Sequence, residues 1–154
     1  MLVNNTLYLE VGKHLEKYPD AAMFLMRYGD LCHAVDDLID WDNPTFKDRR
    51  LLVLDCFNLE LDVFSCPFYH TNVFWLYPIA KNIHRVYSAS VVWEKSDVEW
   101  KRQYADVIRC FGNEMIMAIL EHICHLSYEE LRRIDTLMRE DSWERHHTPE
   151  GKPI

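Results

Sequence analysis

Glycine and the turns that it makes are scarce in this chain of 154 residues, which contains only four glycines. The dipeptides Asn-Gly and Asp-Gly, which form the tightest β-hairpin turns, are absent. Runs in which apolar and polar residues alternate, as they do along a half-buried strand, are also scarce. These absences argue against a β-sheet protein, and the helical spacing of the apolar residues predicts an all-α fold.

Long apolar runs and an excess of basic residues are missing as well. No uninterrupted apolar segment approaches the roughly 20 residues that a membrane-spanning helix needs, and the segment Met1–Asn5 does not begin a secretory signal. The 17 Lys and Arg residues against 25 Asp and Glu give a formal charge of -8, whereas a nucleic-acid backbone needs clustered cations. We therefore expect a cytoplasmic protein with no membrane span and no nucleic-acid partner.

Paired cysteines are the last notable absence. The cysteines are five in number, lack a paired short spacing and fall mostly on apolar faces of expected helices: Cys32, Cys56, Cys66, Cys110 and Cys124. This pattern is typical of reduced, buried thiols and not of a disulfide framework. An apolar content of 49% is enough for a chain of this length to form one domain with a core of its own.

About five or six helices are expected, because capping boxes occur at Thr45–Asp48 and Ser127–Glu130 and because Pro19 and Pro44 interrupt the helical pattern. The expected helices cover Asn5–Lys17, Asp20–Trp41, Thr45–Phe64, Tyr69–Glu94, Ser96–Leu126 and Ser127–Glu144. Pro78 splits or kinks the fourth of them near Tyr77. We expect a single helical bundle over residues 1–145, followed by a flexible tail over residues 146–154.

Acidic residues gather at the end of the second expected helix. Residues three and four apart on a helix lie on one side, so His33, Asp36 and Asp40 form a column, with Asp37 about a quarter turn away. Each carboxylate at this end interacts unfavourably with the helix dipole, at a cost of about 0.3–1 kcal/mol. A divalent cation that prefers oxygen ligands would offset this cost. The alternative interpretation is a solvated acidic face.

A second polar stripe follows the expected helix Ser96–Leu126. Asn113 and Glu121 lie two turns apart on nearly one face, and their oxygens are ordinary ligands of Mg²⁺ or Mn²⁺. Arg109, one turn before Asn113, carries a guanidinium that suits phosphate oxygens. An exposed polar edge is the alternative for this stripe.

The segment Arg27–Asp40 resembles the first Asp-rich helix of the class I isoprenoid and terpenoid synthases, including the squalene and phytoene synthase branch. The residues that match its Asp-Asp-x-x-Asp pattern are Asp36, Asp37 and Asp40. Asn113 and Glu121 match the first and last members of the second metal motif of the terpene synthases, and Met117 stands where that motif has a hydroxyl ligand.

This resemblance implies a reduced form of the isoprenoid-synthase fold that uses Mg²⁺, or Mn²⁺, to bind or act on a small diphosphate-containing molecule. A lyase or transferase activity on that diphosphate would follow. The expected metal ligands are Asp36, Asp37, Asp40, Asn113 and Glu121. The expected substrate-binding residues are His33 and Arg109.

Two other functions stay open. The segment Tyr104–Ile108 resembles one helix of the all-α nucleotide pyrophosphohydrolases, which also present carboxylates to Mg²⁺. A non-enzymatic interaction module, which binds a basic protein partner through its acids, needs no metal. The aromatic residues between positions 64 and 77 favour a core or a homodimer surface over a pocket wall: Phe64, Phe68, Tyr69, Phe74, Trp75 and Tyr77.

Overall fold

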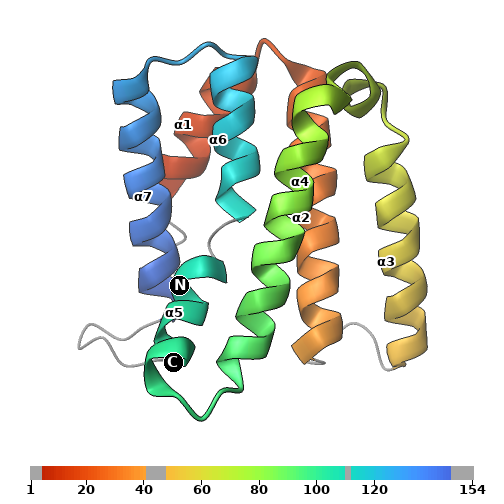
Figure 1. The fold of residues 1–154 in the computed structure, drawn as a ribbon. Coiled ribbons are helices and arrows are strands. Elements are labelled where there is room, and N and C mark those ends of the chain that lie inside the picture. The colour runs from red at the N-terminus through yellow and green to blue at the C-terminus, as the bar shows by residue number, and fades with distance from the viewer. Residues whose placement is uncertain (1–4, 41–47, 110–111, 147–154) are drawn as a thin grey trace. The chain divides into compact units, whose positions relative to one another are not determined.

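Helices make up the regular structure of the chain (Figure 1). The computed structural model describes residues 5–40, 48–109 and 112–146, which contain seven helices and no strand. The helices are α1 Asn5–Leu15, α2 Pro19–Asp40, α3 Arg49–Phe64, α4 Pro67–Glu94, α5 Glu99–Arg109, α6 Asn113–His122 and α7 Tyr128–His146. The all-α fold is confirmed, although these ranges hold more helices than the five or six expected. None of these seven helices is long and apolar enough to cross a membrane.

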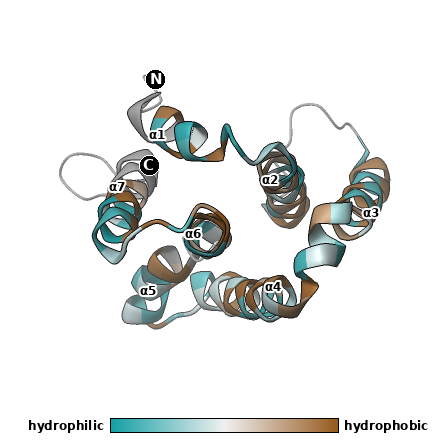
Figure 2. Ribbon diagram, turned by 90° about the horizontal axis from the view of Figure 1, so that it is seen from above, coloured by the Kyte–Doolittle hydropathy of each residue, from teal (hydrophilic) through white to brown (hydrophobic). Residues whose placement is uncertain are grey.

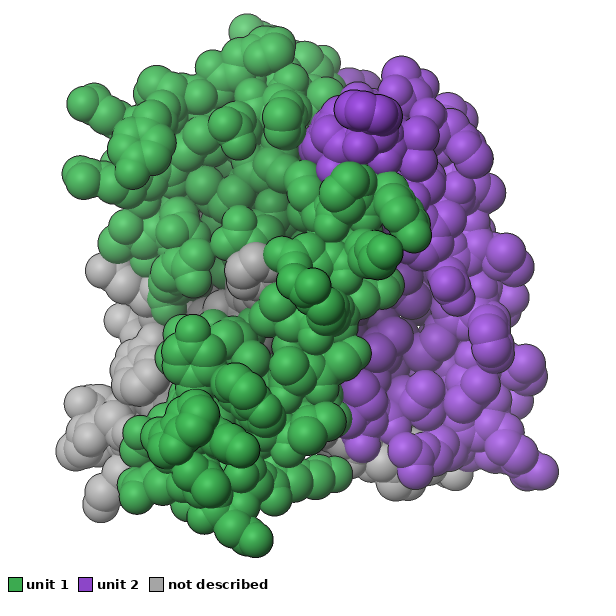
Figure 3. Space-filling view, in the orientation of Figure 1, with its two compact units in different colours: residues 1–18, 77–154 green, residues 19–76 purple. Residues whose placement is uncertain are grey.

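The chain divides into two compact units (Figure 3). Unit 1 comprises residues 1–18 and 77–154, and unit 2 comprises residues 19–76. The division falls inside α4, immediately before Tyr77, which precedes the proline that was expected to split or kink this segment. Helix α4 continues through Pro78, which cannot donate a backbone hydrogen bond to the carbonyl of Phe74. The single domain over residues 1–145 stays a prediction, and residues 147–154 of the expected tail lie outside the described ranges.

Unit 2 has an aromatic core where α2, α3 and the first part of α4 meet. The buried ring of Phe24 lies 5.4 Å from the ring of Phe68 and 6.2 Å from that of Tyr69, centroid to centroid. The ring of Phe64 meets Tyr69 edge-on at 5.0 Å. Of the aromatic residues expected in a core or a homodimer surface, Tyr69 is buried in this core and Phe64 and Phe68 pack at its edge, whereas Phe74 is 94% exposed.

Unit 1 packs α1, α6 and α7 around an aliphatic core. Leu120 of α6 is buried with Ile134 and Met138 of α7, and Val11 of α1 packs against the same cluster. An ion pair between Arg133 and Glu10 joins α7 to α1. Exposed ion pairs add at most about 1 kcal/mol, so the apolar contacts carry most of the stability of this unit.

Side-chain caps fix two helix starts. Before α7, the backbone N–H of Ser127 donates to the Glu130 carboxylate at 2.9 Å, and the N–H of Glu130 donates to the Ser127 hydroxyl at 3.3 Å, which confirms the predicted capping box. The Ser127 hydroxyl also holds the pKa of Glu130 below its ordinary value. Helix α3 starts after Asp48, whose carboxylate accepts from the N–H of Arg50, and residues 45–47 of the predicted cap lie outside the described ranges.

The single helix expected over Ser96–Leu126 is wrong. The structure has two helices there, α5 and α6, and the second is preceded by Gly112. The chain then leaves the helix after His122, and His125 adopts a left-handed φ of 55°. The apolar residues of this segment do not form one buried face, because Trp100 and Tyr104 of α5 are more than half exposed while the apolar face of α6 is buried.

Candidate functional site

Helix α2 places the expected acidic column beside its buried stripe. The buried residues of α2 are Ala21, Phe24, Tyr28, Leu31 and Ala34. Asp36 and Asp37, which follow this stripe, are half-buried, and His33 is exposed. Asp40 is the last residue of the helix, and its side chain lies outside the described residues. The expected column therefore has an exposed first member, His33, and a half-buried second member, Asp36.

A cation from the neighbouring helix lies at this end of α2. The Arg49 guanidinium at the start of α3 donates to the backbone carbonyl of Leu38 at 2.9 Å. The last carbonyls of a helix lack helical donors and form the negative end of its dipole. Arg49 therefore offsets part of the negative charge at this end of α2. The sequence had suggested a metal ion for this role.

The half-buried carboxylates lie near two cysteine thiols. Burial is the main reason that the pKa of Cys32 rises to about 11, and the negative charge of Asp36 adds to it. Burial also raises the pKa of Cys56 on α3, with further contributions from the charges of Asp55 and then Asp37. Acidic side chains of α2 and α3 thus approach the same thiol, which makes this part of unit 2 electrostatically negative.

Among the described side chains, no group of three or more His, Cys, Asp or Glu residues is arranged to hold a metal ion. Asp36 and Asp37 are a pair on one helix turn, and the third member of the expected set, Asp40, lies outside the described side chains. The magnesium site at this end of α2 stays a prediction.

The second expected set lies on α6, in unit 1. Asn113 is the first residue of α6 and is half-buried, whereas Glu121 near its end is exposed. They are separated by about 12 Å along the helix axis, and Met117 between them packs toward the core shared with α7. The side chain of Arg109, at the end of α5, lies outside the described residues. The convergence of the α6 residues with the acids of α2 stays a prediction.

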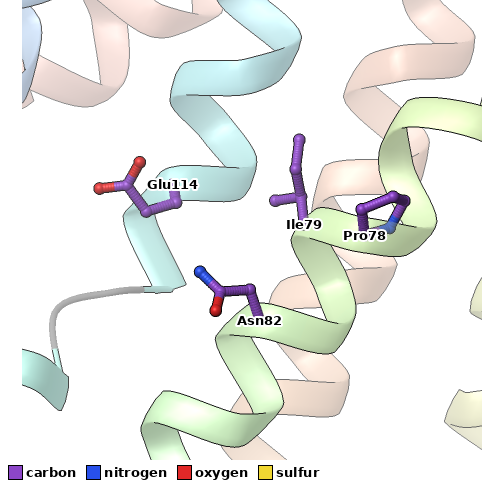
Figure 4. A pocket seen from close by; sticks show the side chains of 4 residues that line it. All are labelled: Pro78, Ile79, Asn82 and Glu114. Carbon is purple, nitrogen blue, oxygen red and sulfur yellow. The ribbon is translucent and has the colours of Figure 1, made fainter.

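A shallow pocket lies between α4 and α6 within unit 1 (Figure 4). Its volume is about 420 Å³, and its lining residues are Pro78, Ile79, Asn82 and Glu114. Figure 4 shows Asn82 directed from α4 toward α6, where Glu114 lies in the first turn. The Glu114 carboxylate is engaged by Arg139 of α7 at 3.3 Å. None of the residues expected to bind metal or substrate lines this pocket.

Sequence reasoning missed the outward face of α3. Four large apolar side chains of this helix are between 54% and 68% exposed: Leu51, Leu54, Phe57 and Leu61. In Figure 2 the ribbon of α3 mixes brown and teal along its length. A helix with apolar residues all round is normally covered on every side, and the spread of apolar residues around α3 was the signal in the sequence that could have revealed this surface.

A second exposed group involves the start of α5. The ring of Trp100 lies 5.8 Å from that of Trp93, and Tyr104 lies 5.9 Å from Trp93. The Lys101 ammonium lies 5.7 Å from the centroid of the Trp100 ring. The described residues thus combine two exposed apolar surfaces with a shallow pocket. Compared with models of known protein families, with curated proteins and with solved structures, the chain matches none.

Proposed function

We propose that the protein is a helical interaction module, which binds another protein chain through the outward face of α3. The observation that carries this proposal is the exposure of Leu51, Leu54, Phe57 and Leu61 on that face. A contiguous apolar surface of this kind marks an interaction site, whereas exposed apolar residues that occur singly do not.

The arrangement of the polar groups also supports binding over catalysis. The described pocket is shallow, and its carboxylate at Glu114 already pairs with Arg139. At the end of α2, the Leu38 carbonyl already receives a hydrogen bond from Arg49. At both places, partners within the protein already engage these polar groups.

Substitution of an outward-facing residue should leave the isolated chain stable. For Leu54→Glu we expect the free energy of unfolding to change by no more than about 0.5 kcal/mol, because a side chain already 58% exposed loses little contact in the monomer. Urea unfolding followed by circular dichroism, at concentrations where the chain sediments as a monomer, measures this change. A loss above about 2 kcal/mol would show that the chain itself covers α3, and the proposed interaction surface would be withdrawn.

A magnesium-dependent protein that binds a diphosphate ligand is the second candidate. It is favoured by the half-burial of Asp36 and Asp37 and by the approach of Asp37 and Asp55 to the same thiol. Carboxylates that are partly withdrawn from water and close to one another suit a divalent cation. The class I isoprenoid synthases and the nucleotide pyrophosphohydrolases both use Mg²⁺ in this general way.

Melting in the presence of ligands separates the two candidates. The interaction module predicts a melting temperature that changes by less than about 1 °C on addition of Mg²⁺, Mn²⁺, prenyl diphosphates or nucleotides. A bound ligand would instead stabilise the fold by about 2.7 kcal/mol at one hundred times its dissociation constant. A clear shift that disappears in the double variant Asp36→Ala with Asp40→Ala would establish the magnesium candidate. A shift that survives in this variant would place the metal elsewhere.

A further inference from the structure

The exposed residues of α3 form one continuous face. At about 100° per residue, Leu51, Leu54, Phe57 and Leu61 fall within an arc of about 120°. The buried residues Leu52 and Val63 lie on the opposite side of the helix. The arc also contains Arg50 and Asn58. Its width matches the apolar stripe by which one helix packs on another.

The charges of α3 run against its own dipole. Arg49 and Arg50 occupy the first turn, and Glu60 and Asp62 lie near the last. Cations at a helix N-terminus and anions near its C-terminus are both unfavourable in an isolated helix. Within the chain, the exposed Arg50 guanidinium pairs with Asp48 at 2.6 Å. Beside a helix that runs in the opposite direction and carries the same sequence, the basic start of each helix faces the acidic end of the other, and Arg50 gains a second carboxylate as a partner.

We infer that the outward face of α3 binds α3 of a second copy of this chain, with the two helices antiparallel about a twofold axis near the middle of α3. This inference rests on the proposed function and names the partner. With the axis at that position, Leu51 of one copy lies opposite Leu61 of the other, and Arg50 lies opposite Asp62. An isologous contact of this kind uses the same surface on both copies and closes at the dimer.

Sedimentation equilibrium of the full chain tests the pairing with a matched pair of variants. Phe57→Glu and Phe74→Glu make the same chemical change at two exposed phenylalanines of unit 2, one on the outward face of α3 and one on α4. Each substitution occurs twice in a symmetric dimer, so a tenfold effect per site becomes about a hundredfold effect on the dissociation constant. We expect this rise for Phe57→Glu and less than a threefold change for Phe74→Glu. Leu54→Glu provides a second variant on the face, with circular dichroism as the check of folding.

A charge exchange tests the antiparallel direction. Arg50→Glu places acids opposite each other across the twofold axis, and Asp62→Arg places bases opposite each other. Each single variant should weaken the dimer about tenfold at low salt, and the double variant should recover most of the loss. Failure of the double variant to recover would overturn the antiparallel register.

The other outcomes separate this pairing from the proposed function. A chain that stays monomeric up to millimolar concentration, or a dimer that Phe57→Glu does not weaken, overturns the pairing through α3. The proposed function survives either result if Leu54→Glu leaves the stability of the monomer unchanged, and the face of α3 then belongs to a different partner. If Leu54→Glu destabilises the monomer, the proposed function fails together with the pairing.

Discussion

Phe24→Ala is expected to lower the free energy of unfolding of unit 2 by about 3–5 kcal/mol. The ring is buried and lies within about 6 Å, centroid to centroid, of three others, at 6.0 Å from Tyr28, 5.4 Å from Phe68 and 6.2 Å from Tyr69. Its removal leaves a cavity between α2 and α4 and ends these aromatic contacts, each worth about 0.5–1.5 kcal/mol beyond the burial itself. Urea unfolding followed by far-ultraviolet circular dichroism measures the change.

Phe74→Ala is the matched control for this prediction. The Phe74 side chain is 94% exposed, so its truncation should change the free energy of unfolding by no more than about 0.5 kcal/mol. Equal losses for the two variants would contradict the aromatic core of unit 2, since they would show that burial does not distinguish these positions. The contrast tests the packing of α2 against α4 without reference to any function.

Leu120→Ala should destabilise unit 1 by about 2–5 kcal/mol. Leu120 is fully buried and joins α6 to Ile134 and Met138 of α7. Because this core has few buried residues, few side chains can shift into the cavity that the missing leucine leaves. Thermal unfolding and urea unfolding should both detect the loss, as a lower melting temperature and a lower midpoint.

Leu9→Ala in α1 gives the comparison within unit 1. Leu9 is 61% exposed, and its truncation should cost no more than about 0.5 kcal/mol. A cost as large as that of Leu120→Ala would mean that α1 packs by another face than the one on which Val11 meets the core. The pair therefore tests the orientation of α1 as well as the core.

Several features of the fold could be predicted from local signals. The capping box at Ser127 and Glu130 gave the start of α7, and Pro19 and Pro44 bracketed α2, because caps and prolines act within a few residues of their own position. The break between α5 and α6 could not be read in this way. Its apolar spacing continues across residues 97–126, and only packing determines that Trp100 stays exposed while Met115 is buried.

The candidate site was less predictable than the fold. The column of His33, Asp36 and Asp40 follows from the helical period of α2, and the structure places Asp36 and Asp37 beside the buried stripe of that helix. Spacing does not show what a neighbouring helix brings to the same place, and Arg49 of α3 reaches the end of α2 from a different part of the sequence. The outward face of α3 was not predicted, because helical periodicity identifies one buried face. The other apolar residues of α3, which lie outside that face, are not explained by a core.

The division of the chain into units has a consequence for its synthesis. Unit 2 is one continuous stretch, residues 19–76, whereas unit 1 joins residues 1–18 to residues 77–154. Helix α1 precedes unit 2 in the sequence, yet its packing partners α6 and α7 follow unit 2 and are translated after it. Unit 2 can therefore assemble while translation continues, whereas α1 must wait for the synthesis of α6 and α7 before its apolar side is covered.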